Sequence, residues 1–239
     1  MKKIMVCDSG VGGLAVLKLL AEKFNCFSYY YVSDLMNVPY GNKDIQTIRG
    51  YCRRFIETAK KIKVDLIVVA CNTMSLVGKD VFLQQNIPTI FVEPDVQKIK
   101  NCNPEKTKLF CTTASSKLLN FDFWKNGGDF CIVPLEGLAQ EIEEKILNLN
   151  EVNLSFLNAH KLPLGGNVFL GCTHYLHLRE RFKKFYKNSN IWDGTENLME
   201  QLKNFSFTNE NSKEICSFTF LGSGKEKMEK IFFNVKDKK

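Results

Sequence analysis

The chain has 239 residues, of which 44% are hydrophobic and 25% charged, a composition typical of a soluble globular protein with one large or two smaller domains. Its formal net charge is only +7, and it carries no zinc finger, RNA-recognition motif or basic repeat, which argues against a nucleic-acid partner. No apolar stretch approaches the roughly 18 uninterrupted residues of a membrane-spanning helix, so no membrane partner is expected.

Strands and helices alternate along the chain. We expect strands at 3–7, 28–32, 66–70 and 89–92 in the first part, with helices through about residue 24 and at 46–61. Further strands are expected at 108–111, 130–133, 168–170 and 218–221, with helices at 135–147 and 226–233. This order predicts an α/β fold whose parallel sheets are covered by helices.

The segment 93–95 (Glu-Pro-Asp) is interpreted as a crossing between two halves, and the last strand and helix as a return to the first half. The predicted domains are therefore 1–94 plus 208–239, and 95–207. The polar run 208–214 is predicted to be flexible.

The chain has nine cysteines, an odd number. No secretory leader precedes the apolar run 4–7, and several cysteines lie in or beside strand-like segments, where free cysteine behaves as a small hydrophobic residue. We therefore expect reduced thiols in a cytoplasmic protein and no disulfide framework.

Two cysteine loops nearly repeat each other. Val-Ala-Cys-Asn-Thr (69–73) and Leu-Gly-Cys-Thr-His (170–174) each follow an apolar strand. A cysteine at such a junction meets backbone N–H groups and the positive end of a helix dipole, which favour its thiolate. Cys71 and Cys172 can then face each other across one cleft, which suits a proton acceptor and a proton donor on opposite faces of one carbon atom.

Residues 7–13 form a glycine-rich turn after the first strand, where parallel sheets bind ligands. With Ala15 in the last place of the dinucleotide pattern and Asp34 as the ribose-binding acid, a nucleotide site is an alternative. Asp8 and Asp34 also have simple explanations as helix-cap or turn residues.

Three further features flank the cysteine loops. Val-Pro-Tyr-Gly (38–41) is a rigid turn able to aim backbone amides and a tyrosine into a cleft. The hydroxyl and N–H groups of 111–116 suit a carboxylate, although a helix cap explains them equally well. His174 lies within reach of the Cys172 thiol.

Other chemistries fit less well. A cysteine hydrolase using Cys172 with His174 has poor triad geometry and leaves Cys71 unused. A metal site built from these three residues lacks the paired cysteine spacing of structural zinc, so no metal is expected. His160 and His177 join no constellation and are interpreted as surface residues.

Four motifs together resemble the glutamate racemases of the aspartate/glutamate racemase superfamily. They are Cys-Asp-Ser-Gly-Val-Gly-Gly-Leu (7–14), Val-Pro-Tyr-Gly (38–41), Val-Ala-Cys-Asn-Thr (69–73) and Leu-Gly-Cys-Thr-His-Tyr (170–175). Their order and spacing match over essentially the whole chain and outweigh the nucleotide interpretation. The resemblance implies two pseudo-symmetric α/β domains with the site between them. It further implies a cofactor-independent enzyme that interconverts L- and D-glutamate, supplies D-glutamate to peptidoglycan synthesis and forms a homodimer.

By position, the resemblance makes Cys71 and Cys172 the proton-transfer residues, assisted by Asp8 and His174 respectively. The substrate pocket that it implies is lined by Ser9, Asp34, Pro39, Tyr40, Gly41, Asn72, Thr73, Thr112, Ser115 and Thr173. Because an ordinary cysteine titrates near ~8.5, a modest downward shift is expected to populate the thiolate.

Several positions depart from the family pattern. Met74 replaces an alanine, Ser115 a threonine and Leu176 a proline, and the glutamate of the family's Val-Pro-Leu-Val-Glu is shifted to Glu136 or missing. The alternatives left open are an aspartate or other amino-acid racemase, and a catalytically weakened member that acts as a binding protein.

Overall fold

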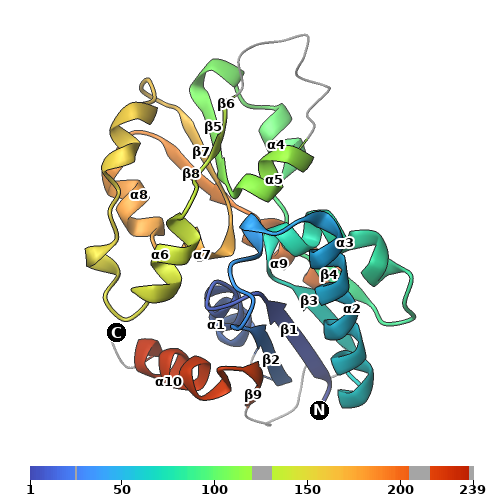
Figure 1. Cartoon of the computed structure of the whole chain (residues 1–239). Helices are drawn as coiled ribbons and strands as arrows, with labels where there is room; N and C mark the ends of the chain where they lie inside the picture. Colours follow the sequence, from blue (N-terminus) through green and yellow to red (C-terminus); the bar gives the residue numbers. More distant parts are fainter. Residues whose placement is uncertain (25, 120–130, 205–215, 237–239) are drawn as a thin grey trace.

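The computed structural model of the chain describes residues 1–24, 26–119, 131–204 and 216–236. Its strands form two parallel sheets with helices packed around them, which confirms the predicted α/β fold (Figure 1). The strands are β1 (Lys3–Asp8), β2 (Ser28–Asp34), β3 (Leu66–Val69), β4 (Thr89–Phe91), β5 (Thr107–Cys111), β6 (Cys131–Pro134), β7 (Asn167–Gly171), β8 (Asn190–Asp193) and β9 (Ser217–Ser223). The α-helices are α1 (Gly13–Lys23), α2 (Ile45–Ile62), α3 (Asn72–Leu83), α4 (Val96–Lys100), α5 (Thr113–Leu118), α6 (Leu138–Glu144), α7 (Thr173–Leu176), α8 (Arg179–Phe185), α9 (Thr195–Asn204) and α10 (Lys225–Lys236).

The first sheet has the strand order β4-β3-β1-β2-β9, with the first strand of the chain at its centre. β3 is a wholly buried apolar run, as expected for a parallel strand covered on both faces. Along β1, Val6 faces one packed layer and Cys7 the other. Cys7 pairs with Val69, so the loops after β1 and β3 leave the same edge of the sheet.

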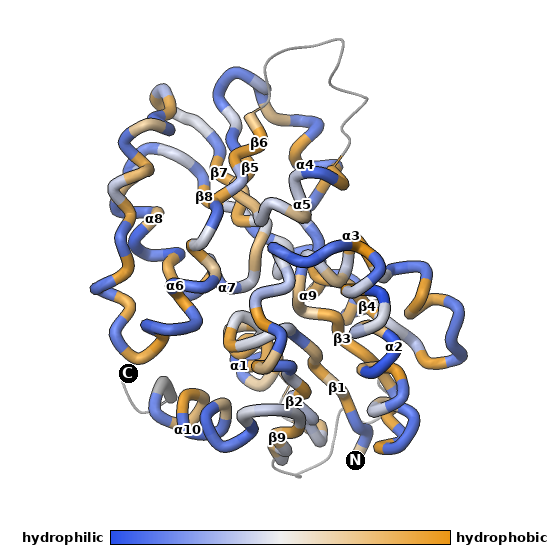
Figure 2. The backbone as a smooth tube through the Cα atoms, viewed as in Figure 1, coloured by the Kyte–Doolittle hydropathy of each residue, from blue (hydrophilic) through white to orange (hydrophobic). Residues whose placement is uncertain are grey.

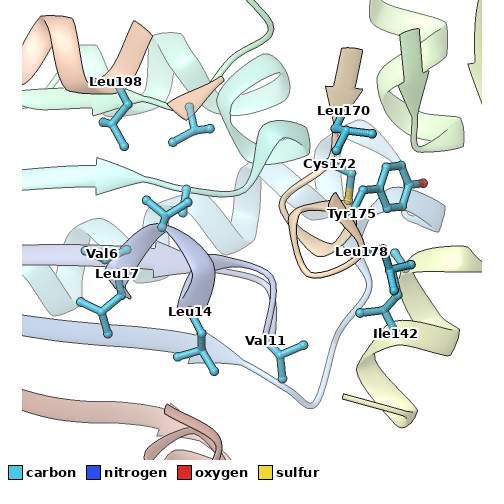
Figure 3. Close-up of a cluster of buried hydrophobic side chains, with 14 of the residues drawn as sticks. Val6, Val11, Leu14, Leu17, Ile142, Leu170, Cys172, Tyr175, Leu178 and Leu198 are labelled. Carbon is cyan, nitrogen blue, oxygen red and sulfur yellow. The ribbon is translucent and has the colours of Figure 1, made fainter. Parts of the chain in front are cut away.

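The second sheet has the order β6-β5-β7-β8. Cys111 pairs with Gly171, which brings the loops that precede α5 and α7 together at the carboxyl edge. One continuous cluster of buried side chains joins the two halves, from Leu14 beside the first sheet to Leu170 and Tyr175 in the second (Figure 3). Figure 2 shows hydrophobic stretches along the strands of both sheets.

The chain crosses between the sheets after β4 and returns after β8. The two crossings lie against each other, since a Cβ atom on Gly194 would sit 2.5 Å from the carbonyl oxygen of Glu93. α9 packs against β4, and β9 pairs with β2. The domain boundaries stay a prediction. Their limit at 207/208 and the run 208–214 lie outside the described residues.

Some elements differ from the sequence-based expectation. The helix predicted at 135–147 is the shorter α6, because Gly137 takes a positive φ of 76° as its N-cap. β8 and α4 are not predicted by the pattern, since each contains too few apolar residues to show a period. No helix among the described residues is both long and apolar enough to cross a membrane.

Candidate active site

Cys71 and Cys172 occupy equivalent places in the two sheets. Cys71 is the N-cap of α3, just after β3, and Cys172 is the N-cap of α7, directly after β7. Both side chains are buried, and the Cys172 thiol is close enough to raise the pKa of Cys71. The fold therefore brings together the two thiols that lie 101 positions apart in the sequence.

The surroundings of Cys71 do not favour its thiolate. Burial raises the pKa of the Cys71 thiol and the Asp8 carboxylate adds to this, while the backbone N–H of Met74 offsets only part of it. Its Sγ lies 3.9 Å from Oγ of Ser9. The expected downward shift is therefore wrong for Cys71 in this structure, because desolvation outweighs the helix N-terminus.

Asp8 lies between the two halves. Its Oδ1 accepts a hydrogen bond from Gly10 N at 2.9 Å, and its Oδ2 accepts one from the Thr173 hydroxyl at 3.0 Å. Burial raises the pKa of Asp8, although the nearby His174 and these hydrogen bonds oppose the shift. Gly12 permits this approach, because a Cβ atom there would lie 2.5 Å from Oγ1 of Thr173. The glycine-rich turn therefore packs against α7.

His174 lies between Cys172 and the buried carboxylate of Glu143. Its Nδ1 is 3.8 Å from the Cys172 Sγ, and its Nε2 is 2.9 Å from Oε2 of Glu143, which also accepts from Val11 N at 2.9 Å. Burial favours neutral His174, but its hydrogen bonds with Cys172 and Glu143 prevail and raise its pKa well above the ordinary value. Burial likewise favours neutral Glu143, yet the hydrogen bond with His174 leaves the pKa of Glu143 lowered. Both shifts favour the charged pair, an ionised Glu143 carboxylate beside a protonated His174.

Glu143 is the functional candidate that reasoning from the sequence misses. Glu136, considered there instead, is exposed. A signal was present: Glu143 follows Ala139 by four residues and adjoins Ile142, on the buried side of α6. A charged residue in such a position requires a buried partner.

Thr73, Thr112 and Ser115 form a buried hydroxyl cluster between α3 and α5. Thr73 Oγ1 lies 3.1 Å from Thr112 Oγ1 and 3.3 Å from Ser115 Oγ. Thr112 Oγ1 in turn donates to Ser115 Oγ at 3.0 Å. Gly41 packs directly on Thr112, and a cavity of about 390 Å³ lined in part by Gly41 and Thr113 lies beside the cluster.

Asp34 is not brought into the cysteine network. Its carboxylate accepts hydrogen bonds from the Tyr40 hydroxyl at 2.8 Å and the Asn37 amide at 2.9 Å. Pro39 follows a cis peptide bond and leads into the 3₁₀ helix η1 (Tyr40–Asn42). Burial raises the pKa of Tyr40, and the charges of Asp34 and Cys71 add to this.

Two other polar side chains have backbone partners. Asn72 donates its amide to Val92 O at 3.2 Å. The surface interpretation of His177 is wrong: the residue is half-buried, its Nε2 donates to Val11 O at 3.0 Å, and burial lowers its pKa to about 4. Within the described residues, no group of three His, Cys, Asp or Glu side chains is placed to hold a metal ion.

No protein-family model matches the chain. The chain is 30% identical over 241 residues to the curated glutamate racemase of Halothermothrix orenii, and the match covers 94% of each chain. Its fold is similar to that of glutamate racemase from Thermus thermophilus in complex with beta-chloro-D-alanine, with a TM-score of 0.80, 23% identity and coverage of 98% and 93%. It is also similar to that of glutamate racemase from Francisella tularensis in complex with D-glutamate, with a TM-score of 0.75, 23% identity and coverage of 98% and 94%. On the match with the Halothermothrix protein, the chain belongs to the glutamate racemase family.

Proposed function

We propose that the chain interconverts L- and D-glutamate by proton transfer at the α-carbon, with Cys71 and Cys172 on opposite faces of the substrate. One observation carries the proposal: the two thiols occupy matching strand-to-helix junctions, and each has its own acid–base neighbour. Membership of the glutamate racemase family supports the reaction, and the D-glutamate bound to the Francisella protein supports the substrate.

The two cysteines together account for both the proton that leaves the α-carbon and the proton that returns to it. A thiolate takes the α-proton, the C–H bond breaks and its electron pair stays on carbon. The opposite thiol then gives its proton to that carbon and becomes the thiolate. The two cysteines exchange protonation states in each turnover, and the reverse reaction uses the same groups in opposite roles.

On the Cys172 side, His174 is the assisting residue. With its Nε2–H directed at Glu143, its Nδ1 faces the Cys172 sulfur. An imidazolium in this position stabilises a Cys172 thiolate and can return a proton to it.

On the Cys71 side, Asp8 is the assisting residue. A thiol with a raised pKa rests in its protonated form at neutral pH, which suits the proton donor. A carboxylate whose pKa is also raised is a better proton acceptor than an ordinary aspartate, and Asp8 fits that description.

The carbanion requires groups that stabilise charge developing on the substrate carboxylate. We assign this to the buried hydroxyl cluster (Thr73, Thr112 and Ser115) together with backbone N–H groups at the starts of α3 and α7. The proposal also keeps the other predicted residues as the lining of the substrate pocket. They are Ser9, Asp34, Pro39, Tyr40, Gly41, Asn72 and Thr173. Further parts of the proposal, taken from the family resemblance, are supply of D-glutamate to peptidoglycan synthesis, cytoplasmic location and assembly as a homodimer.

The test is circular dichroism of D-glutamate in D₂O, with α-hydrogen exchange followed by NMR. D-aspartate runs as the rival substrate, and Cys71→Ser, Cys172→Ser and the control Cys102→Ser are compared. Racemisation with deuterium uptake, lost in the first two variants and kept in the control, is the expected result. Turnover of aspartate but not glutamate would change the substrate assignment to aspartate. Absence of α-hydrogen exchange with both acids would overturn the proposal.

A further inference from the structure

One oxygen of the Glu143 carboxylate takes no part in the contact with His174. Oε2 is bound by His174 and by Val11 N, whereas Oε1 is buried and has no hydrogen-bond donor among the described residues. A cation faces it: Nζ of Lys227 lies 3.9 Å from Oε1 and also donates to the backbone oxygen of Glu143 at 3.3 Å.

Lys227 reaches Glu143 from the other half of the molecule. It lies on α10, which follows β9 of the first sheet, whereas Glu143 lies on α6 of the second half (Figure 1). The Glu143 side chain is only 5% exposed and that of Lys227 is 46% exposed. The contact therefore brings a partly hydrated charge to a buried carboxylate, across the boundary between the halves.

We propose that Lys227 is a positioning residue for the Cys172 side of the site: it holds Glu143 ionised and oriented, and through Glu143 it keeps His174 protonated against the Cys172 sulfur. The kinetic consequences rest on the proposed function. The electrostatic consequence for His174 does not, and it can be measured without turnover.

Few of the charged groups around Glu143 stabilise its ionised form, which gives the charge of Lys227 its importance. Asp8, on β1, opposes ionisation of Glu143 through its own negative charge. Tyr31, on β2, is held neutral by burial, and His177 is neutral because burial lowers its pKa to about 4. His174 and Lys227 both face this carboxylate, and the positive charge of each lowers its pKa.

The kinetic signature follows from the symmetry of the reaction. Because enantiomers have an equilibrium constant of one, any variant changes kcat/KM equally in both directions. A change confined to Cys172 instead alters which proton transfer limits the rate. The deuterium isotope effect should therefore rise for the enantiomer whose α-proton Cys172 removes and fall for the other.

The experiment compares Lys227→Met with Lys230→Met, an exposed lysine one turn further along α10, and with Lys227→Arg as the conservative rescue. In Lys227→Met we expect kcat/KM to fall about threefold to tenfold, in line with a partly screened charge at this distance. The alkaline limb of its rate profile should move to lower pH and the isotope effects should diverge. Lys230→Met should match the parent, and Lys227→Arg should restore most of the rate.

A second measurement separates this proposal from the proposed function. The chain has only 3 histidines, so NMR of ¹⁵N-histidine-labelled protein resolves His174 once His160→Gln and His177→Gln assign the other two. The pKa of His174 should fall in Lys227→Met and stay unchanged in Lys230→Met, whether or not glutamate is the substrate. An unchanged His174 titration in a folded Lys227→Met protein would overturn the proposal, even if its rate were lower.

Discussion

The Thr173 hydroxyl donates a 3.0 Å hydrogen bond to Oδ2 of Asp8, a residue 165 positions earlier in the chain. Both side chains are buried. The contact joins the end of β1 to the start of α7, beside Cys172. The two halves of the molecule are therefore held together by buried polar contacts within the candidate site as well as by the shared apolar cluster.

Thr173→Val keeps the shape of the side chain and removes its hydroxyl. Asp8 then loses a donor in a buried place, so we expect the free energy of unfolding to fall by about 1–3 kcal/mol. The loss should be larger at pH 8 than at pH 4, because Asp8 needs the donor most when ionised and burial favours its protonated form in acid by raising its pKa. Urea unfolding at the two pH values measures this, and Thr173→Ser, which keeps a hydroxyl, is the control. Equal stability of the valine and serine variants would contradict it.

Gly12→Ala tests the close approach of the first turn to α7. An added Cβ atom would lie 2.5 Å from Thr173 Oγ1 and 2.8 Å from the backbone nitrogen of His174. We expect a loss of about 1–3 kcal/mol in unfolding free energy, together with lower activity, as for overpacked cores. Gly50→Ala is the matched control in α2, where nothing lies within 4 Å of the added carbon. That change should instead stabilise the protein by about 0.5–1 kcal/mol. Thermal unfolding measures the stability of both variants. Equal stability of the two would contradict the close packing of Gly12 against α7.

Glu143→Gln removes the charge that holds His174 and keeps the side-chain volume. Since the Glu143 carboxylate helps to raise the pKa of His174, that pKa should fall in the variant. We expect kcat/KM to drop roughly tenfold to a hundredfold and the alkaline limb of the rate profile to move to lower pH. Glu144→Gln and Glu136→Gln change residues without this contact and should keep the parent rate. Parent kinetics in Glu143→Gln would show that the buried carboxylate has no part in the reaction.

His177→Gln tests a half-buried imidazole that its lowered pKa keeps neutral at neutral pH. The glutamine amide can still donate to Val11 O, but it does not titrate. Because the folded pKa of His177 is about 4, the unfolded chain takes up its proton first as the pH falls below about 6.5. The parent should therefore lose about 1–3 kcal/mol relative to His177→Gln between pH 6.5 and pH 4, and the two should be similar at pH 8. Urea unfolding across this range checks the sign, and a constant difference would rule out the titration of His177 as its source.

The sequence by itself determined the parallel α/β fold and the cysteine loops. Short apolar runs such as 66–69 have the length and the β-branched content typical of a covered strand, and the loops after them are local in the chain. Cys71 and Cys172 follow such strands directly, so their places at strand-to-helix junctions could be predicted. The family resemblance was also carried by local motifs.

Only the tertiary structure decided which side chains meet and how strongly each thiol and carboxylate is desolvated. Glu143 reaches His174 because α6 packs against α7, and Lys227 reaches Glu143 because β9 returns α10 to the boundary between the halves. Likewise, the raised pKa of Cys71 follows from its burial beside Asp8, which the local helix N-terminus does not reveal. Contacts between distant segments and the loss of water around them depend on the packed fold, so no local pattern encodes them.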